Sequence, residues 1–290
     1  MELKCIRSPR DLSLRKLIKC LVGNLGLALF PQSGRRVEQD PYAQKLNRFD
    51  RMLRNGLLYR ALRSGDHEKL ANYLKDYWSG SEGKEFHEEY SFRFQEVFLQ
   101  HHIRAVEAFE NIASSTKLDI NRLYEIGCGS GQVLDHLSKR LSGIEEFVGI
   151  DLSEEQINEI RETYKGSPSM RFVAADAATW LAENAEPGAV VFTNGGVFEL
   201  FNQRTLQKLF AHIASSLKPA AIVAIETFGN DHDLQTELDT IAFGGGGEIG
   251  FSHNYPHLLR EAGFRIAFQE ERIAEDQNRW ILIVAVAEGS

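Results

Sequence analysis

Three glycines after the apolar run 123–126 are the residues that most clearly point to chemistry. Gly127, Gly129 and Gly131 stand between this run and a segment with helical spacing. Because glycine has no Cβ, such a loop can turn sharply and let a ligand approach the backbone. The next apolar run ends at Asp151, where a carboxylate can accept hydrogen bonds from both hydroxyls of a ribose. The spacing therefore predicts a nucleoside-binding site.

Simpler explanations exist for both features. Glycine loops of this kind also occur in plain turns, but here the loop joins a predicted strand to a predicted helix. Asp151 could cap the following helix, although Ser153 already suits that role, with Gln156 three residues later. A nicotinamide-binding loop would read G-x-G-x-x-G, whereas the third glycine here comes one residue early.

The same positions resemble class I S-adenosylmethionine-dependent methyltransferases over about residues 121–290. The resemblance rests on residues after the first four predicted strands: Glu125 with the three glycines, then Asp151, then Ala175, Asp176 and Ala177, and finally the segment 192–199. It implies that S-adenosylmethionine is bound and that S-adenosylhomocysteine is the product.

The resemblance also implies roles at the methionine end of this cofactor. Gly127 and Gly129 would lie against the methionine part, in the loop that Gly131 completes. Glu125 would orient the ammonium group, partly through water, and Asn194 would offer it a backbone carbonyl.

At the nucleoside end, Asp151 would hold the ribose and Leu152 would lie against the adenine face. Asp176 would accept a hydrogen bond from the exocyclic amine, which suits a carboxylate because that amine is a donor. The backbone of Ala177 would contact the ring edge. A helix cap is the alternative role for Asp176.

Methyl transfer to oxygen benefits from a general base, and the sequence offers three candidates. His253 lies beyond the fifth strand, where this fold places substrate-side residues; the alternative is a residue that begins a helix beside Asn254. Glu199 follows the fourth strand, and the pair His101 and His102 lies on a helix before the sheet.

Seven apolar runs predict an α/β fold with a Rossmann-like seven-stranded sheet and helices on both faces. They span 123–126, 147–150, 172–174, 190–192, 221–225, 264–268 and 281–286. Crossover helices fit between the first five, which indicates parallel strands. The connection between the last two is short and polar, so we expect an antiparallel hairpin at the C-terminal edge.

The chain is predicted to have three parts: 1–36, 37–115 and 116–290. The region before the sheet is predicted to be helical. Helices are expected over 68–78 and about 84–112, and the region 37–115 is interpreted as a lid or accessory segment. The aromatic cluster 77–90 could gate the site or simply pack helices on the sheet. The glycine run within 243–248 predicts a flexible loop.

Charge is distributed unevenly along the chain. Residues 1–36 carry a net charge of +6 within a total of −8, so the remainder carries −14. Their apolar run 17–30 is too short to span a bilayer. It favours a helix packed on the catalytic domain or on a partner protein, and leaves open a peripheral contact with an anionic membrane or a cleaved targeting segment. Three cysteines without paired spacing indicate a cytoplasmic protein, and a homodimer stays open.

The substrate is predicted mainly by what the sequence lacks. Thr193 to Gly196 do not read as the Asn/Asp-Pro-Pro-Tyr/Phe motif of nucleic-acid amine methyltransferases, and the acidic domain has no phosphate-binding stripe. Nucleic acid is therefore not expected. The segment 193–196 also has no aspartate that could hold magnesium, so no metal site is expected. We expect O-methylation of a small-molecule or sugar hydroxyl; a protein or RNA methyltransferase and a non-catalytic cofactor-binding subunit are the alternatives.

Overall fold

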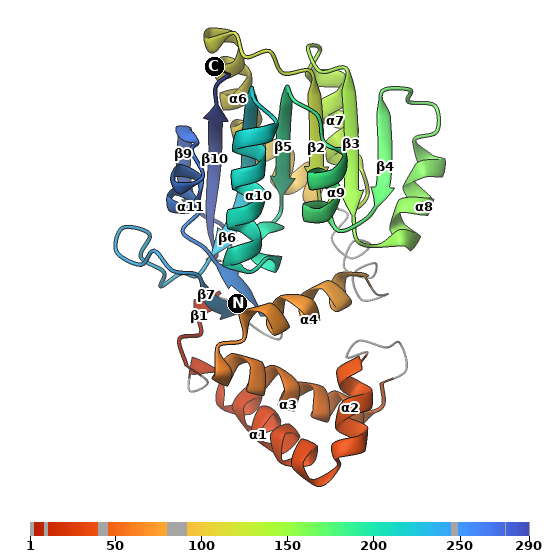
Figure 1. Ribbon diagram of the computed structural model, residues 1–290, viewed down its shortest axis with the longest axis vertical. Helices are drawn as coiled ribbons and strands as arrows, with labels where there is room; N and C mark the ends of the chain where they lie inside the picture. The colour runs from red at the N-terminus through yellow and green to blue at the C-terminus, as the bar shows by residue number, and fades with distance from the viewer. Residues whose placement is uncertain are drawn as a thin grey trace.

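The computed structural model describes residues 3–8, 11–39, 46–79, 92–244, 249–275 and 277–289. Its centre is a seven-stranded sheet with the strand order β4-β3-β2-β5-β6-β10-β9 (Figure 1). The strands are β2 (Arg122–Ile126), β3 (Glu146–Asp151), β4 (Met170–Ala174), β5 (Ala189–Asn194), β6 (Ala220–Phe228), β9 (Arg265–Ile273) and β10 (Arg279–Ala287). The first five pair in parallel, and β10 runs antiparallel between β6 and the edge strand β9. The predicted fold class and C-terminal hairpin are confirmed.

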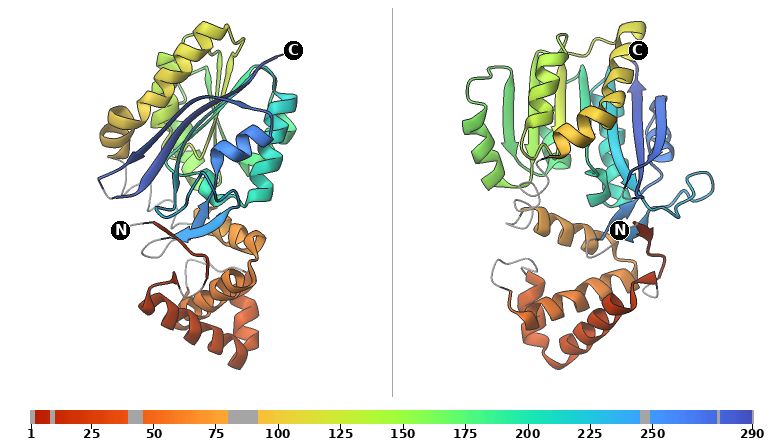
Figure 2. Two further views of the ribbon diagram at one scale, coloured as in Figure 1. Left: turned by 90° about the vertical axis from the view of Figure 1, so that its left-hand side faces the viewer. Right: turned by 180° about the vertical axis from the view of Figure 1, so that it is seen from behind.

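Helices cover both faces of this sheet (Figure 2). One face packs against α9 (Ala177–Asn184), α10 (Gln203–Ser216) and α11 (Tyr255–Glu261). The other packs against α6 (Ile103–Thr116), α7 (Gln132–Arg140) and α8 (Glu154–Thr163). All nine residues of β6 are buried, as expected for a strand covered on both sides. The sheet is therefore a rigid support for the loops at its carboxyl edge.

The last part of the segment before the sheet forms a helical layer on the sheet. The π-helical segment η2 (Phe94–His102) continues directly into α6. Phe98, Val106 and Phe109 from these helices are buried in the same apolar cluster as β2 and β5. Part of the region 37–115 is thus a layer of the sheet domain, because its apolar side chains are needed to cover that face. The start of the helix predicted from residue 84 lies outside the described residues.

Four helices precede this layer: α1 (Leu14–Leu29), α2 (Pro31–Gln39), α3 (Arg48–Ser64) and α4 (His67–Ser79). The predicted helix 68–78 corresponds to α4. Figure 1 shows α1, α2 and α3 together at one end of the molecule, with α4 between them and the sheet. The apolar run 17–30 lies mostly in α1, which packs chiefly on α3. The expectation that this run packs on the sheet domain is therefore not met. A Cβ on Gly56 would overlap the backbone of Gly23, so the two helices are in backbone contact. Over the described ranges, no helix is long and apolar enough to cross a membrane.

A second, small sheet was not predicted. It contains β1 (Lys4–Cys5), β7 (Ile241–Gly244) and β8 (Gly250–Ser252), in the order β1-β7-β8. The predicted glycine loop therefore starts inside a strand, at Gly244, and its remaining glycines lie outside the described residues. Asp231 accepts a hydrogen bond from Cys5 N at 2.7 Å and pairs with Arg7 at 2.8 Å. These contacts bring the N-terminal segment to the carboxyl edge of the main sheet.

Candidate active site

The glycine loop joins β2 to α7 and needs glycine at each of its three positions. The φ angles are +70° at Gly127, +48° at Gly129 and +73° at Gly131, all in the left-handed region. A Cβ on Gly127 would lie 2.9 Å from Val197. The loop therefore presents bare backbone to the space above the sheet edge.

Asp151 at the end of β3 holds this loop in place. Its Oδ2 accepts a hydrogen bond from Gly129 N at 3.0 Å, and its Oδ1 accepts one from Ser153 N at 3.0 Å. The carboxylate is buried but lines the pocket described below. Ser153 caps α8 by accepting from Gln156 N, as expected, so Asp151 is left for another role.

Glu125 at the end of β2 is a buried carboxyl group next to the same loop. Burial raises its pKa well above the ordinary value, and the nearby charge of Asp151 raises it further. Its Oε2 has no hydrogen-bond partner within the part of the chain that the structure describes. A buried acceptor without a partner is costly, so this atom is suited to receive a donor or a cation from a ligand.

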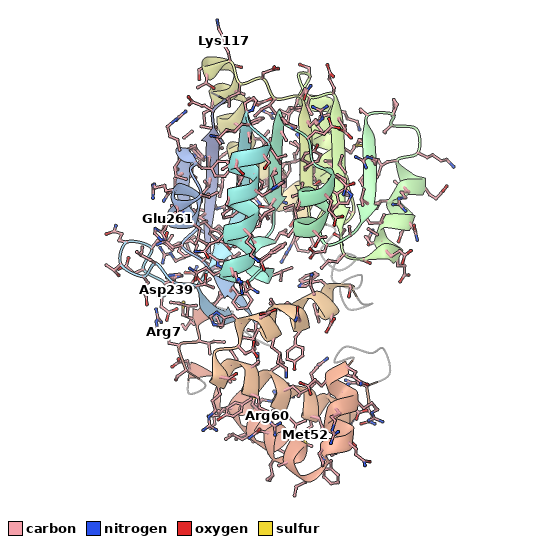
Figure 3. The ribbon with its side chains drawn as sticks, viewed as in Figure 1. Arg7, Met52, Arg60, Lys117, Asp239 and Glu261 are labelled. Carbon is pink, nitrogen blue, oxygen red and sulfur yellow. The ribbon has the colours of Figure 1, made fainter. Side chains whose placement is uncertain are left out.

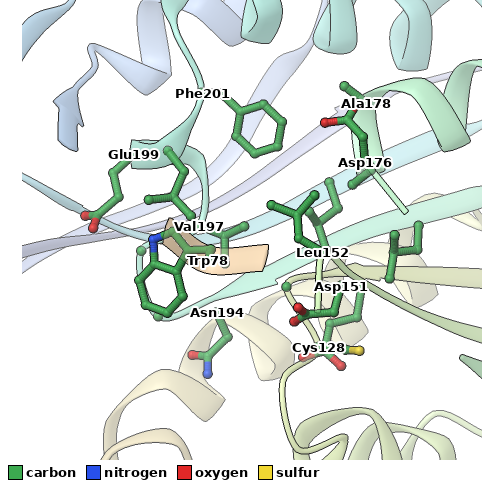
Figure 4. Close-up of a pocket in the computed structure, with 18 of the residues that line it drawn as sticks. Trp78, Cys128, Asp151, Leu152, Asp176, Ala178, Asn194, Val197, Glu199 and Phe201 are labelled. Atoms are coloured by element: carbon green, nitrogen blue, oxygen red, sulfur yellow. The ribbon is translucent and has the colours of Figure 1, made fainter. Parts of the chain in front are cut away.

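These residues border a pocket of about 730 Å³ at the carboxyl edge of the sheet (Figure 4). This volume lies within the range of about 300–1,000 Å³ found for small-molecule sites. Apart from Gly131, every residue predicted to bind the cofactor lines it: Glu125, Gly127, Gly129, Asp151, Leu152, Asp176, Ala177 and Asn194. Gly131 instead packs its backbone against Tyr164.

Asp176 carries out its alternative role as well as facing the pocket. Its Oδ1 caps α9 by accepting from Thr179 N at 3.0 Å, and its Oδ2 pairs with Lys75 of α4 at 2.6 Å. Burial acts to raise the pKa of Asp176, but the hydrogen bonds from Lys75 and Thr179 lower it below its usual range. The carboxylate thus stays charged and connects the sheet domain to the N-terminal helices.

Asn194 at the end of β5 is held by His102, the last residue of η2. Its Oδ1 lies 2.7 Å from Nδ1 of His102, which is buried beside the ring of Trp280. Burial lowers the pKa of His102 to about 4, so the ring is neutral at physiological pH. His102 does not line the pocket. Its position favours orienting Asn194 over acting as a base.

Glu199 is the base candidate that the structure brings to the pocket. It lies on the short 3-10 helix η3 (Phe198–Leu200) and accepts a hydrogen bond from Thr227 Oγ1. The buried Glu226 anchors this helix by accepting from Phe198 N at 2.9 Å and from Thr193 Oγ1 at 2.5 Å. Burial raises the pKa of Glu226 to about 8, against the lowering effect of the Thr193 hydrogen bond.

His253 lies away from the pocket, contrary to its expected placement. It follows β8 of the small sheet, is completely buried, and places Nδ1 2.6 Å from Thr240 Oγ1. Burial lowers its pKa to about 3. Asn254 caps α11 by accepting from His257 N, so the alternative interpretation of this segment as a helix start is the one observed. The chain forms the β7–β8 hairpin, which packs on η3, before it reaches His253. His253 therefore does not directly follow the fifth strand of the main sheet, as the rule for that edge assumed.

The helix α4 contributes Asn72, Lys75 and Trp78 to the pocket, and Figure 4 shows Trp78 across the pocket from Asp176. Trp78 belongs to the aromatic cluster that was expected to gate the site or to pack helices, whereas Asn72 and Lys75 were not predicted. Only Tyr77, Trp78 and Ser79 of the predicted aromatic gate 77–90 belong to the described residues. Leu3, Asn278 and Trp280 also line the pocket. No local motif marks these positions, because they reach the site only through the packing of distant segments.

Comparison with known proteins relates the segment that carries this site to methyltransferases. Residues 123–220 match the family model described as a methyltransferase domain. The chain is 23% identical over 166 residues to malonyl-[acyl-carrier protein] O-methyltransferase 2 from Ilyobacter polytropus, covering 54% of this chain and 60% of that protein. It is 24% identical over 154 residues to carboxy-S-adenosyl-L-methionine synthase from Helicobacter pylori, covering 52% and 64%. The matched segment thus spans about three fifths of these relatives.

Solved structures share the fold at low sequence identity. Magnesium protoporphyrin IX methyltransferase from Synechocystis PCC 6803, solved with bound S-adenosylmethionine, superposes with a TM-score of 0.51 at 16% identity over 74% of this chain and 96% of that one. An S-adenosylmethionine-dependent methyltransferase from Clostridium acetobutylicum gives 0.51 at 12% identity over 70% and 99%. Residues 123–220, which include the glycine loop and its neighbouring strands, thus match a methyltransferase domain, and the two solved structures share the fold of the chain.

Proposed function

We propose that this protein transfers the methyl group of S-adenosylmethionine to a hydroxyl group of a small molecule or sugar. The observation that carries the proposal is the buried Oε2 of Glu125, which lines the pocket without a partner among the described residues. A methionine ammonium group would supply a cation that favours the charged form of this buried carboxyl group.

The other groups in the pocket fit the same donor. Asp151 presents a carboxylate already fixed by two backbone N–H groups, and it keeps acceptor capacity for ribose hydroxyls. Leu152 and Ala177 offer apolar surface for a base, and Asp176 offers a charged acceptor. When bound, the sulfonium group supplies an already activated methyl group, so no covalent enzyme intermediate is needed.

The acceptor would occupy the part of the pocket bordered by Glu199, Thr227 and Trp280. This part combines a carboxylate, a hydroxyl and an aromatic ring, which suits a neutral polyhydroxy compound. Glu199 is the group proposed to take the hydroxyl proton, because Thr227 holds its Oε2 and Glu226 anchors its helix. The name of the Ilyobacter relative, an O-methyltransferase, agrees with an oxygen acceptor.

The helix α4 contributes exclusion of water from the site. Trp78 and Lys75 reach the pocket from the N-terminal side, and the Lys75–Asp176 ion pair ties α4 to the sheet domain. A site shielded from water favours the acceptor hydroxyl over solvent as the nucleophile.

The test is S-adenosylhomocysteine release from purified protein with a panel of hydroxylated small molecules and sugars. With an accepted compound, Glu199→Gln should lower kcat about 100-fold near neutral pH, within the usual contribution of a general base, while S-adenosylhomocysteine binding is retained. Glu261→Gln is the matched control, because Glu261 is an exposed carboxylate of α11 that does not line the pocket (Figure 3). Binding without turnover on any acceptor would refute catalysis, and full activity of Glu199→Gln would refute the proposed base.

A further inference from the structure

The helix α1 exposes a continuous stripe of large apolar side chains. Its members, here called the α1 apolar face, are between 46% and 74% exposed: Leu14, Ile18, Leu21, Val22, Leu25 and Leu29. They recur at three- and four-residue spacings, so they share one side of the helix. Scattered exposed leucines are ordinary, but a contiguous apolar surface of this kind usually marks an interaction site.

The opposite side of α1 already supplies the contacts that the fold needs. Cys20, Gly23, Gly26 and Leu27 are buried, and Gly23 meets the backbone of Gly56 on α3. The α1 apolar face therefore points away from α3. Since α1 is attached to the neighbouring helices through its other side, no described residue needs the α1 apolar face for packing.

The helices around this face are strongly basic. Together α1, α2 and α3 carry ten lysine and arginine residues and only two acidic residues, Glu38 and Asp50. Both acids are already paired, Glu38 with Lys69 and Asp50 with Arg36. Arg15 and Lys19, both exposed on α1, lie beside the apolar face in the helical repeat. Exposed apolar and cationic groups are thus combined on one end of the molecule.

We propose that the α1 apolar face binds an anionic membrane surface, with α1 lying in the plane of the lipid headgroups. Such a surface offers apolar acyl chains to the leucines and negative charge to the surrounding cations. A second copy of this chain would match the apolar side chains but would bring two groups of ten cations together, which charge repulsion opposes. The location of α1–α3 at one end of the molecule, away from the sheet, leaves this surface open to a membrane (Figures 1 and 3). At 16 residues, α1 is too short to span the bilayer, so it would lie on the surface.

The test is vesicle co-sedimentation of the full chain, and it requires no methyl acceptor. Vesicles of phosphatidylcholine with about one third phosphatidylglycerol should bind the protein, whereas pure phosphatidylcholine should bind it at least about tenfold more weakly. The double variant Leu21→Gln/Leu25→Gln should lower the partition coefficient on anionic vesicles by about tenfold or more, through the loss of buried apolar groups. Arg15→Gln/Lys19→Gln should lower it by a similar factor and reduce its dependence on salt.

The matched control is Leu238→Gln/Ile273→Gln. These two side chains are 47% and 66% exposed, compared with 46% and 60% for Leu21 and Leu25, but they lie outside α1–α3. The control should bind like the wild type, and all variants should unfold at the wild-type temperature because only exposed positions change. Equal loss of binding in the control, or no binding of the wild type to anionic vesicles, would overturn the proposal. So would a dimer in analytical ultracentrifugation that only Leu21→Gln/Leu25→Gln dissociates, since a second copy would then occupy the face.

Discussion

Replacing Asp151 with asparagine should weaken both the fold of the glycine loop and the binding of ligand. The carboxylate accepts hydrogen bonds from two backbone N–H groups, one on each oxygen. An asparagine has one acceptor oxygen, so either Gly129 N or Ser153 N would face an NH₂ group. Leaving one buried N–H without an acceptor costs about 1–3 kcal/mol. At about 2–4 °C per kcal/mol for a domain of this size, the melting temperature should fall by roughly 2–12 °C.

Ligand affinity should fall further, because hydrogen bonds to a charged carboxylate are stronger than those to an amide. Losing the charge-assisted bonds to two ribose hydroxyls removes about 2–4 kcal/mol of binding free energy, or roughly 30- to 1,000-fold in Kd. Isothermal titration calorimetry with S-adenosylhomocysteine measures this directly. Thermal unfolding with and without the ligand checks that the variant is folded and reports the same loss as a smaller ligand-induced shift.

The control for this experiment is Asp135→Asn. Asp135 lies on α7 near the loop, pairs with Lys139 at the surface and does not line the pocket. Its loss should change stability by less than about 1 kcal/mol and leave ligand binding unchanged. If Asp151→Asn is folded and binds S-adenosylhomocysteine within about threefold of the wild type, the assignment of this carboxylate to the nucleoside is refuted.

Three further predictions concern stability. Burial raises the pKa of Glu226 from an ordinary 4.5 to about 8, so the stability that its protonated form contributes is complete below about pH 4.5 and is lost as the pH rises through 8. Glu226→Gln should flatten the fall in melting temperature between these two pH values, and an unchanged slope would contradict the raised pKa. Gly56→Ala should destabilise the protein by about 1–3 kcal/mol through overlap with Gly23, whereas Gly143→Ala, which has no neighbour within 4 Å, should not, as urea unfolding will show. Asp176→Ala removes the cap of α9 and should lower the free energy of unfolding by about 1 kcal/mol. Lys75→Met removes only the ion pair, whose side chains are 48% and 24% exposed, and should lower it less. A larger loss for Lys75→Met than for Asp176→Ala, measured by differential scanning calorimetry, would argue against these two roles.

The sheet domain was largely predictable because its signals are local. Each strand is a short apolar run, and the glycines and Asp151 stand directly where such runs end. Lys75 shows the limit of this approach: α4 was predicted from helical spacing, but the contact of Lys75 with Asp176 depends on packing between segments about 100 residues apart in the sequence. Ion pairs such as Lys75–Asp176 leave no pattern in a single sequence.

The small sheet escaped prediction for a different reason. β1 and β8 contain two and three residues, and β7 ends in a glycine, so none has the length or alternation by which strands are recognised. Because the small sheet was not predicted, His253 was expected at the carboxyl edge of the main sheet, although it follows β8 of the small sheet. The correct alternative, a helix start at Asn254, had a clear local cap signal.

The pairing of β1 with β7 has a consequence for the order in which the protein can assemble during synthesis. Cys5 binds Asp231, a residue 226 positions later, and Leu3 borders the pocket. At about 5–20 residues per second, a ribosome takes roughly 10–45 s to make the intervening chain. Through that interval the first strand has no partner strand, while the glycine loop and its neighbouring strands have already emerged. The catalytic pocket is therefore completed only near the end of translation, after most of the sheet that supports it can form.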